Sequence, residues 1–218
     1  QVDLKEIFAL GYEVYWHSAQ KKGYSGVAIF SKIRPNNVSV GCGIDKYDVE
    51  GRVLRADYDG FSVMSVYMPS GSSGDERQAF KMDWLADFQN YINALKIEFP
   101  NLVIAGDYNI CHKAIDIHNP KGNANSSGFL PEEREWMTKL TTEGGLVDVY
   151  HHLHPETTDA CYTWWSNRGQ AYANNVGWRL DYHLATPALA AKALSAAIYK
   201  EEKFSDHAPI TLQYDMAV

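Results

Sequence analysis

The chain changes from apolar to polar within the segment LVIAGDYN, residues Leu102–Asn109. Its four aliphatic residues predict a strand that is buried within a sheet. Gly106 allows the chain to turn, so that Asp107 and Asn109 emerge at the end of this strand. An Asp at a strand end most often caps a turn, and this segment alone leaves that interpretation open.

The residues before this strand predict a helix and a hairpin. Large apolar residues recur at steps of three and four from Asp75 to Phe99, which is typical of an amphipathic helix, and Pro100 ends the pattern. Further upstream, Asp59-Gly60 separates Arg52–Asp57 from Phe61–Met68, and Asp-Gly is a strong hairpin signal.

The residues after the strand predict one more helix and several strands. The helix begins near Pro131 and ends before Gly144-Gly145. Short strands are expected at 27–30, 162–165, 179–184, 196–199 and 210–214. Many strands with few helices indicate an α+β or layered sandwich fold, and the absence of linkers or repeats predicts a single domain over residues 1–218.

Composition narrows the functional class. The 218 residues are 45% hydrophobic, and no apolar run approaches the roughly 18 residues that a membrane span requires. The net charge of −7 is opposite to that of a general nucleic-acid coat protein, so any phosphate-binding face must be local. The three cysteines include no CxxC pair, which argues against a zinc ribbon and favours a reducing, cytoplasmic location.

Polar clusters follow several of the predicted strands. Besides Gly106–Asn109 they are Tyr67–Pro69, Trp178–Tyr182 and Ser205–Pro209. In the last of these, Asp206 and His207 are adjacent, so one can face a cation while the other faces a phosphate. Asp181, in an otherwise apolar strand, is the best candidate for the carboxylate that orients His207.

Five strings in a fixed order carry a resemblance that spans nearly the whole chain: GDYN, NPKGN, GFLPEER, NVGWRLDY and SDHAPI. In this order they resemble the exonuclease III family of abasic-site (AP) DNA endonucleases, within the endonuclease/exonuclease/phosphatase superfamily. The resemblance implies a DNase I-like, four-layered α/β sandwich: two mixed β-sheets packed face to face with helices outside. It also implies cleavage of the phosphodiester 5′ to an abasic site, with 3′–5′ exonuclease and 3′-end-clearing activities.

The resemblance assigns roles to individual residues. His207 is similar to the histidine that contacts the scissile phosphate, Asp181 to its orienting carboxylate, and Asp206 to a metal-site carboxylate for Mg²⁺, with Mn²⁺ as an alternative. Asp107 and Asn109 resemble the pair that positions the attacking water, and Tyr67 the family tyrosine near the phosphate. Tyr67 as plain core, and Asn109 or Asp181 as turn residues, are the structural alternatives.

The implied partner is double-stranded DNA with abasic sites or blocked 3′ ends. Asn119, Lys121 and Asn123 would contact backbone phosphates without reading bases. Trp164, Trp178 and Leu180 resemble the apolar pocket for a flipped-out sugar, with core packing as the alternative. Arg168 lies in a loop whose counterpart in family members enters the helix at the lesion.

The start of the chain departs from the family pattern. Family members begin with strands that carry an Asn and a Gln-Glu-Thr-like string, whose Glu is a principal metal ligand, and neither string is present. We therefore expect weak metal binding, an unpaired sheet edge that favours aggregation, and impaired activity compared with an extended chain, which would be a monomer when complete.

Two other functions stay open. One is a phosphoesterase of the same superfamily acting on inositol phosphates, sphingolipid head groups or nucleotides, although NVGWRLDY and NPKGN favour the DNA repair branch. The other is a DNA-binding or interaction module that has lost catalysis.

Overall fold

A six-stranded mixed sheet forms the centre of the protein in a computed structural model that describes residues 3–217. Strands β5 and β6 are parallel, and the other neighbours are antiparallel. In spatial order the strands are β3 (Asn37–Val40), β4 (Val53–Tyr58), β5 (Phe61–Tyr67), β6 (Leu102–Asp107), β10 (Asp181–Ala185) and β7 (Val147–Asp148). The predicted hairpin and the buried strand after Asn101 are thus confirmed.

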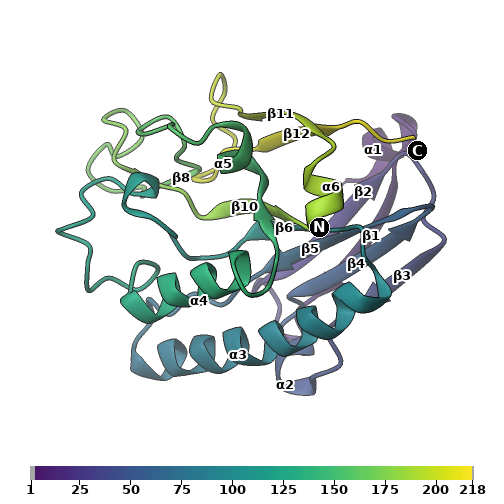
Figure 1. Ribbon diagram of the computed structural model, residues 1–218, viewed down its shortest axis with the longest axis horizontal. Helices are drawn as coiled ribbons and strands as arrows, with labels where there is room; N and C mark the ends of the chain where they lie inside the picture. The colour runs from purple at the N-terminus through teal and green to yellow at the C-terminus, as the bar shows by residue number, and fades with distance from the viewer. Residues whose placement is uncertain (1–2, 218) are drawn as a thin grey trace.

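Two helices, α3 (Asp75–Glu98) and α4 (Pro131–Thr141), cover one face of this sheet (Figure 1). Both occur where the apolar periodicity predicts them. Trp84 and Phe88 of α3 and Met137 of α4 are buried in one cluster with Met64 and Ile104 of the sheet. Burial of large apolar side chains contributes roughly 1.5–3 kcal/mol each, so this cluster is the main source of stability.

The opposite face of the sheet carries two antiparallel ladders: β1 (Glu13–Ser18) with β2 (Gly26–Ser31), and β11 (Ala193–Ile198) with β12 (Ile210–Tyr214). The predicted α+β class is confirmed. The second sheet that we expected is divided into these two ladders. Within residues 3–217, no strand pairs with both of them.

The remaining elements are short. A third ladder joins β8 (Trp164–Trp165) to β9 (Gly177–Trp178). The others are α1 (Lys5–Ala9), α2 (Asp45–Asp48), a 3₁₀ turn (Ala114–Asp116), α5 (Val149–Leu153) and α6 (Pro187–Ala190). Among the described residues, none of the helices combines the length and hydropathy that a bilayer crossing needs.

Gly106 fixes the close approach of β5 and β6. Its φ is +147°, and a Cβ at this position would lie 1.9 Å from the carbonyl oxygen of Val66. Only glycine accommodates both the backbone conformation and the contact. Because Val66 is paired with Gly106, Tyr67 is brought beside Asp107 at the next step.

A buried arginine holds the strand on the other side of Asp107. Arg179, which is 1% exposed, pairs with Asp116 at 2.9 Å and with Asp148. Asp116 also accepts a hydrogen bond from His151 at 2.6 Å if the ring nitrogen Nε2 carries the proton. This network ties the loop after β6 and helix α5 to the start of β10, two residues before Asp181.

We predict that Gly106→Ala lowers the free energy of unfolding by roughly 2–5 kcal/mol, because the new methyl group overlaps backbone in a strained conformation. Gly60→Ala is the matched control: its φ is +83° but no atom lies within 4 Å of the added Cβ, so we expect a loss of only about 1 kcal/mol. Urea unfolding of both variants measures the difference, and equal losses would contradict this account.

Candidate active site

Three polar side chains lie in one row across three adjacent strand ends. Tyr67 of β5 is in register with Asp107 of β6, and Asp107 is directly opposite Asp181 of β10. Cross-strand partners point to the same face of a sheet, so the two strand pairings bring these side chains together. The sequence predicted all three, although they are far apart along the chain.

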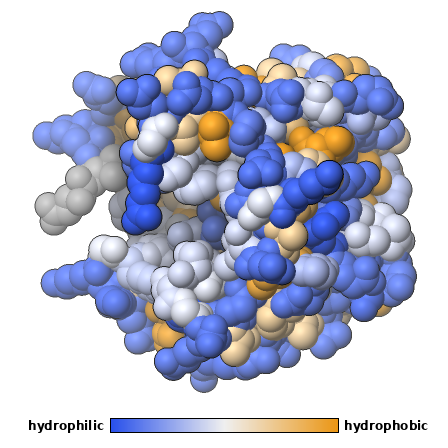
Figure 2. Space-filling model, turned by 90° about the vertical axis from the view of Figure 1, so that its left-hand side faces the viewer, coloured by the Kyte–Doolittle hydropathy of each residue, from blue (hydrophilic) through white to orange (hydrophobic). Residues whose placement is uncertain are grey.

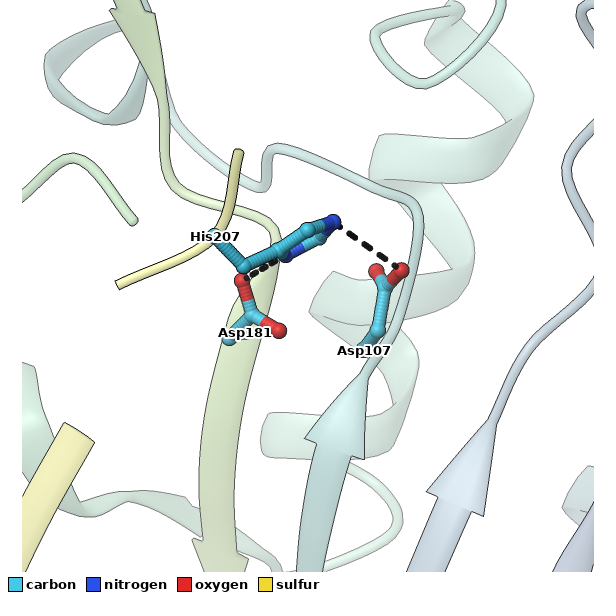
Figure 3. Close-up of side chains that lie close together, drawn as sticks. All are labelled: Asp107, Asp181 and His207. Carbon is cyan, nitrogen blue, oxygen red and sulfur yellow. Dashed lines mark hydrogen bonds and ion pairs between the residues drawn. The ribbon is translucent and has the colours of Figure 1, made fainter. Parts of the chain in front are cut away.

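His207 completes the group from a different part of the fold. It precedes β12 and forms an isolated bridge with Trp164. Its Nδ1 is 2.8 Å from Oδ2 of Asp181, and its Nε2 is 3.9 Å from Oδ2 of Asp107, so the ring lies between the two carboxylates (Figure 3). Nδ1–H donating to Asp181 leaves Nε2 directed toward Asp107.

The paired carboxylates change the proton affinities in this group. Burial, and then the charge of Asp181, raise the pKa of Asp107 to about 7. Burial alone would lower the pKa of His207, but the hydrogen bond and charge of Asp181, followed by the charge of Asp107, raise it to about 9. His207 is therefore a cation at neutral pH, and Asp107 is a carboxylate that can take up a proton there.

Thr163, which the sequence analysis missed, anchors Asp181. Its hydroxyl donates to Oδ2 of Asp181 at 2.7 Å and accepts from the backbone N–H groups of Leu180 and Asp181. The side chain is fully buried. A lone threonine in an apolar run gave no sequence signal, since only the fold brings residues 163 and 181 together.

Arg52 contacts both the backbone and the ring of Tyr67. Its Nη1 donates to the carbonyl oxygen of Tyr67 at 2.9 Å, and its guanidinium lies 5.1 Å from the centre of the Tyr67 ring. Glu50 in turn accepts from Nε of Arg52 at 2.7 Å. Burial, and then the charge of Asp107, raise the pKa of Tyr67, so its hydroxyl remains protonated and can donate a hydrogen bond.

A cleft of about 280 Å³ opens beside this group. It is lined by Tyr67, Ser70, Ser72, Asp107, Asn109, Ser127, Gly128, Trp164, Trp178, Leu180, Asp206 and His207. Trp164, Trp178 and Leu180 pack together and form an apolar wall of this cleft, in which the two indole rings meet edge to face with centroids 6.1 Å apart. Both Asp206 and His207 line this cleft.

Four predicted DNA contacts lie outside the cleft lining. Asn119 and Asn123 use their amides within their own loop, where Asn119 accepts from Gly122 N–H at 3.2 Å and Asn123 donates to the carbonyl of His118 at 3.1 Å. Lys121 and Arg168 are exposed. The face drawn in Figure 2 is mostly hydrophilic with small hydrophobic patches.

The donor atoms suit a hard divalent cation. Ligand atoms of Asp107, Asp181 and His207 lie within 4.8 Å of one another. Asp181 and His207 already bind each other, which leaves two carboxylate donors: Asp107, and Asp206, which lines the same cleft but lies outside this group. Oδ2 of Asp206 accepts from the Trp164 indole at 3.1 Å. Carboxylate oxygens are the ligands that Mg²⁺ prefers, so the residues present fit such an ion.

Sequence comparison places these residues in a known family. Residues 2–207 match the endonuclease/exonuclease/phosphatase family. The chain belongs to this family. Nucleases of the family depend on a metal ion, in agreement with the acidic cluster of this cleft.

One relative and two solved structures are similar to this chain over nearly its whole length. An exodeoxyribonuclease of Bacillus subtilis (strain 168) is 41% identical over 212 residues, which are 97% of this chain and 82% of the relative. The structure of an AP endonuclease from Archaeoglobus fulgidus has a TM-score of 0.89 and 30% identity, covering 99% of this chain and 84% of that one. The 3′ phosphatase NExo from Neisseria, bound to a product DNA hairpin, has a TM-score of 0.89, 28% identity and the same coverage.

We predict that Asp181→Asn lowers the pKa of His207 from about 9 toward its ordinary value near 6.5, because the hydrogen bond to a carboxylate and its charge are both lost. Asp206→Asn is the control, since Asp206 makes a smaller contribution to the same pKa. Titration of the imidazole resonances by NMR in EDTA measures both, and a larger change in the control would rule out the Asp181 assignment.

We also predict that Asp107→Asn stabilises the metal-free protein at pH 8 but not at pH 4. The folded pKa of about 7 exceeds the ordinary 3.8, so the folded state binds this proton more tightly than the unfolded chain. The stabilisation that the folded state gains from binding this proton is complete below pH 3.8 and is lost as the pH rises through 7. Removing the charge should therefore gain roughly 1–3 kcal/mol at pH 8. Thermal unfolding in EDTA tests this, with the exposed Asp215→Asn as control; a gain at pH 4 instead would contradict it.

Proposed function

We propose that this protein is a DNA repair nuclease that hydrolyses the phosphodiester 5′ to an abasic site in double-stranded DNA. The observation that carries the proposal is the Asp181–His207–Asp107 group beside a cleft with one apolar wall. A cation next to a carboxylate of raised pKa suits phosphate hydrolysis. The similarity to an exodeoxyribonuclease and an AP endonuclease supports DNA as the substrate.

In the proposed reaction, His207 binds the substrate phosphate. Its protonated ring donates from Nε2 to a non-bridging oxygen, while Asp181 keeps the ring charged and correctly turned. The Tyr67 hydroxyl donates to the same phosphate, where negative charge develops as the attacking oxygen adds to phosphorus. Both donors are fixed before substrate binds, so little reorganisation is needed.

Asp107 and Asn109 act on the attacking water. Asp107, with a pKa of about 7, accepts the proton of the water, and the bond between phosphorus and the leaving 3′ oxygen breaks as the water oxygen adds. Asn109 is held for this role by its amide, which donates to the carbonyl of Met68 at 2.8 Å. A bound Mg²⁺, or alternatively Mn²⁺, would be held by Asp206 and would supply charge neutralisation at the phosphate and the leaving group.

The apolar wall of the cleft accounts for the choice of lesion. Trp164, Trp178 and Leu180 offer a surface on which a sugar without a base can lie. Gly128 lies against this surface, because an added Cβ would be 3.2 Å from the Trp178 ring. A complete nucleotide would have to fit base and sugar into the same space. Asn119, Lys121, Asn123 and Arg168 would contact the DNA outside the cleft.

Removal of 3′ blocking groups is a second proposed activity of the same site. The similarity to a 3′ phosphatase bound to a product DNA hairpin favours it. A 3′ phosphate presents the same tetrahedral group to His207 and Tyr67, and only the leaving group differs.

The free thiols Cys42, Cys111 and Cys161 support the predicted reducing, cytoplasmic location.

We expect the chain to cleave a duplex carrying one abasic analogue in Mg²⁺ and not in EDTA. His207→Ala should reduce the single-turnover rate by roughly 10²–10⁴-fold while duplex affinity changes little, because the lost contact strengthens in the transition state. Excess protein over DNA keeps slow cleavage measurable. His152→Ala, a histidine outside the cleft, is the matched control and should retain full activity.

Substrate controls separate the alternatives. Intact duplex should be cleaved far more slowly than the abasic duplex, and a 3′-phosphate end should lose its phosphate. Hydrolysis of inositol phosphates or nucleotides without cleavage of any DNA would support the small-phosphoester alternative. DNA binding without hydrolysis of any of these substrates would support the non-catalytic module.

A further inference from the structure

An ion pair that is completely enclosed lies beneath the cleft. Lys81 of α3 and Glu133 of α4 are both 0% exposed, and Nζ of Lys81 is 2.6 Å from Oε1 of Glu133. Neither residue lines the cleft, and neither belongs to the group predicted from the sequence. A buried ion pair is often no more stabilising than apolar residues of similar size, so stability alone gives little reason for it.

Lys81 also binds the turn that follows β6. Its Nζ donates to the carbonyl oxygen of Asn109 at 2.8 Å. Asn109 has a φ of +50°, a left-handed conformation that asparagine tolerates better than most residues other than glycine. The same turn is closed by a hydrogen bond from Asn109 N–H to Oδ1 of Asp107 at 2.8 Å. The Lys81 contact therefore holds the turn that joins two proposed active-site residues.

Glu133 binds the backbone beside Gly128, another residue of the cleft lining. Its Oε2 accepts from the backbone N–H of Gly128 at 2.7 Å and of Leu130 at 3.0 Å. Gly128 in turn accepts from Cys111 N–H at 2.7 Å, two residues after Asn109. One ion pair thus binds two adjacent parts of the cleft lining, the Asn109 turn and Gly128, where an added Cβ would lie 3.2 Å from the Asn109 carbonyl oxygen.

Gln78 extends this connection by one step. Its amide nitrogen donates to Oε1 of Glu133 at 3.0 Å, and its amide oxygen accepts from the Ser127 hydroxyl at 2.7 Å. Every oxygen of the Glu133 carboxylate therefore has a partner, and the carboxylate has one fixed orientation. Burial lowers the pKa of Lys81, but the charge and hydrogen bond of Glu133 oppose this.

We propose that Lys81 is a positioning residue for phosphodiester hydrolysis. Glu133 fixes Lys81, and Lys81 in turn holds the Asn109 carbonyl oxygen. This contact orients Asp107 and Asn109 toward the substrate. This inference rests on the proposed function for its chemistry. It assigns Lys81 no contact with the substrate. A small displacement of such groups can cost about 10²-fold in rate, so a contact of this kind is sufficient to affect catalysis.

The test is a neutral version of the pair, Lys81→Met with Glu133→Gln. The Glu133→Gln change keeps an acceptor for the Gly128 N–H, whereas Lys81→Met removes the donor to Asn109, and no unpaired charge is left buried. Arg55→Met with Asp57→Asn is the matched control. It removes another largely buried ion pair, with an N–O distance of 2.8 Å, on a strand whose residues do not line the cleft.

We expect the Lys81/Glu133 double variant to lose roughly 10–100-fold in single-turnover rate on abasic duplex while duplex affinity stays within about threefold. Hydrogen exchange at Asn109 N–H should accelerate by about tenfold, with the amides of the α3 core unchanged. The Arg55/Asp57 variant should lower the unfolding temperature but retain the rate and the Asn109 exchange. All assays are run well below the unfolding temperature of each variant.

Three results would overturn the proposal: a rate within about threefold of wild type in the Lys81/Glu133 variant, unchanged exchange at Asn109, or an equal loss of rate in the Arg55/Asp57 variant. If the wild-type chain cleaves no DNA, the proposed function fails, and the exchange measurement still decides whether Lys81 holds the turn.

Discussion

The direct opposition of Asp107 and Asp181 across β6 and β10 is the constraint on which the site depends. Two carboxylates facing each other at a strand end repel, and the sheet tolerates them only because other groups share the charge. His207 lies between them and is held as a cation by both. Burial, followed by the charge of Asp181, raises the pKa of Asp107, and the two carboxylates together keep His207 a cation against the opposing effect of its burial.

The rest of the fold maintains this opposition from both sides. Gly106 allows β5 close enough to place Tyr67 in the same row, and Arg52 supports that tyrosine. On the other side, Arg179 and Thr163 hold the start of β10 through buried polar contacts. These groups are far from one another in sequence. Thr163 contacts Asp181 directly, whereas Arg179 acts through Asp116 and Asp148. The site is thus rigid because several independent contacts determine each position.

The sequence predicted the parts of the fold and site that local pattern controls. The periodicity of residues 75–99 and the Asp59-Gly60 turn are short-range signals, and both elements form where expected. The site residues could be singled out because they follow apolar strands and match family strings. Strands β1 and β3 were missed, since Glu13–Ser18 and Asn37–Val40 are half exposed and lack a continuous apolar run. Lys81 and Glu133 looked like ordinary charges of helices, and only the packing of α3 against α4 makes them a buried pair.

The enclosed cysteine next to the active-site turn has a separate consequence. Cys111 is 0% exposed, and its thiol donates to the carbonyl oxygen of Asp116 at 3.4 Å. Burial raises its pKa well above the ordinary value, so the sulfur is almost never a thiolate while the fold is closed. Alkylation by a small reagent then requires the loop to open, and its rate reports how often that happens. The alkylation rate of Cys111 is therefore a measure of transient opening beside the proposed active site.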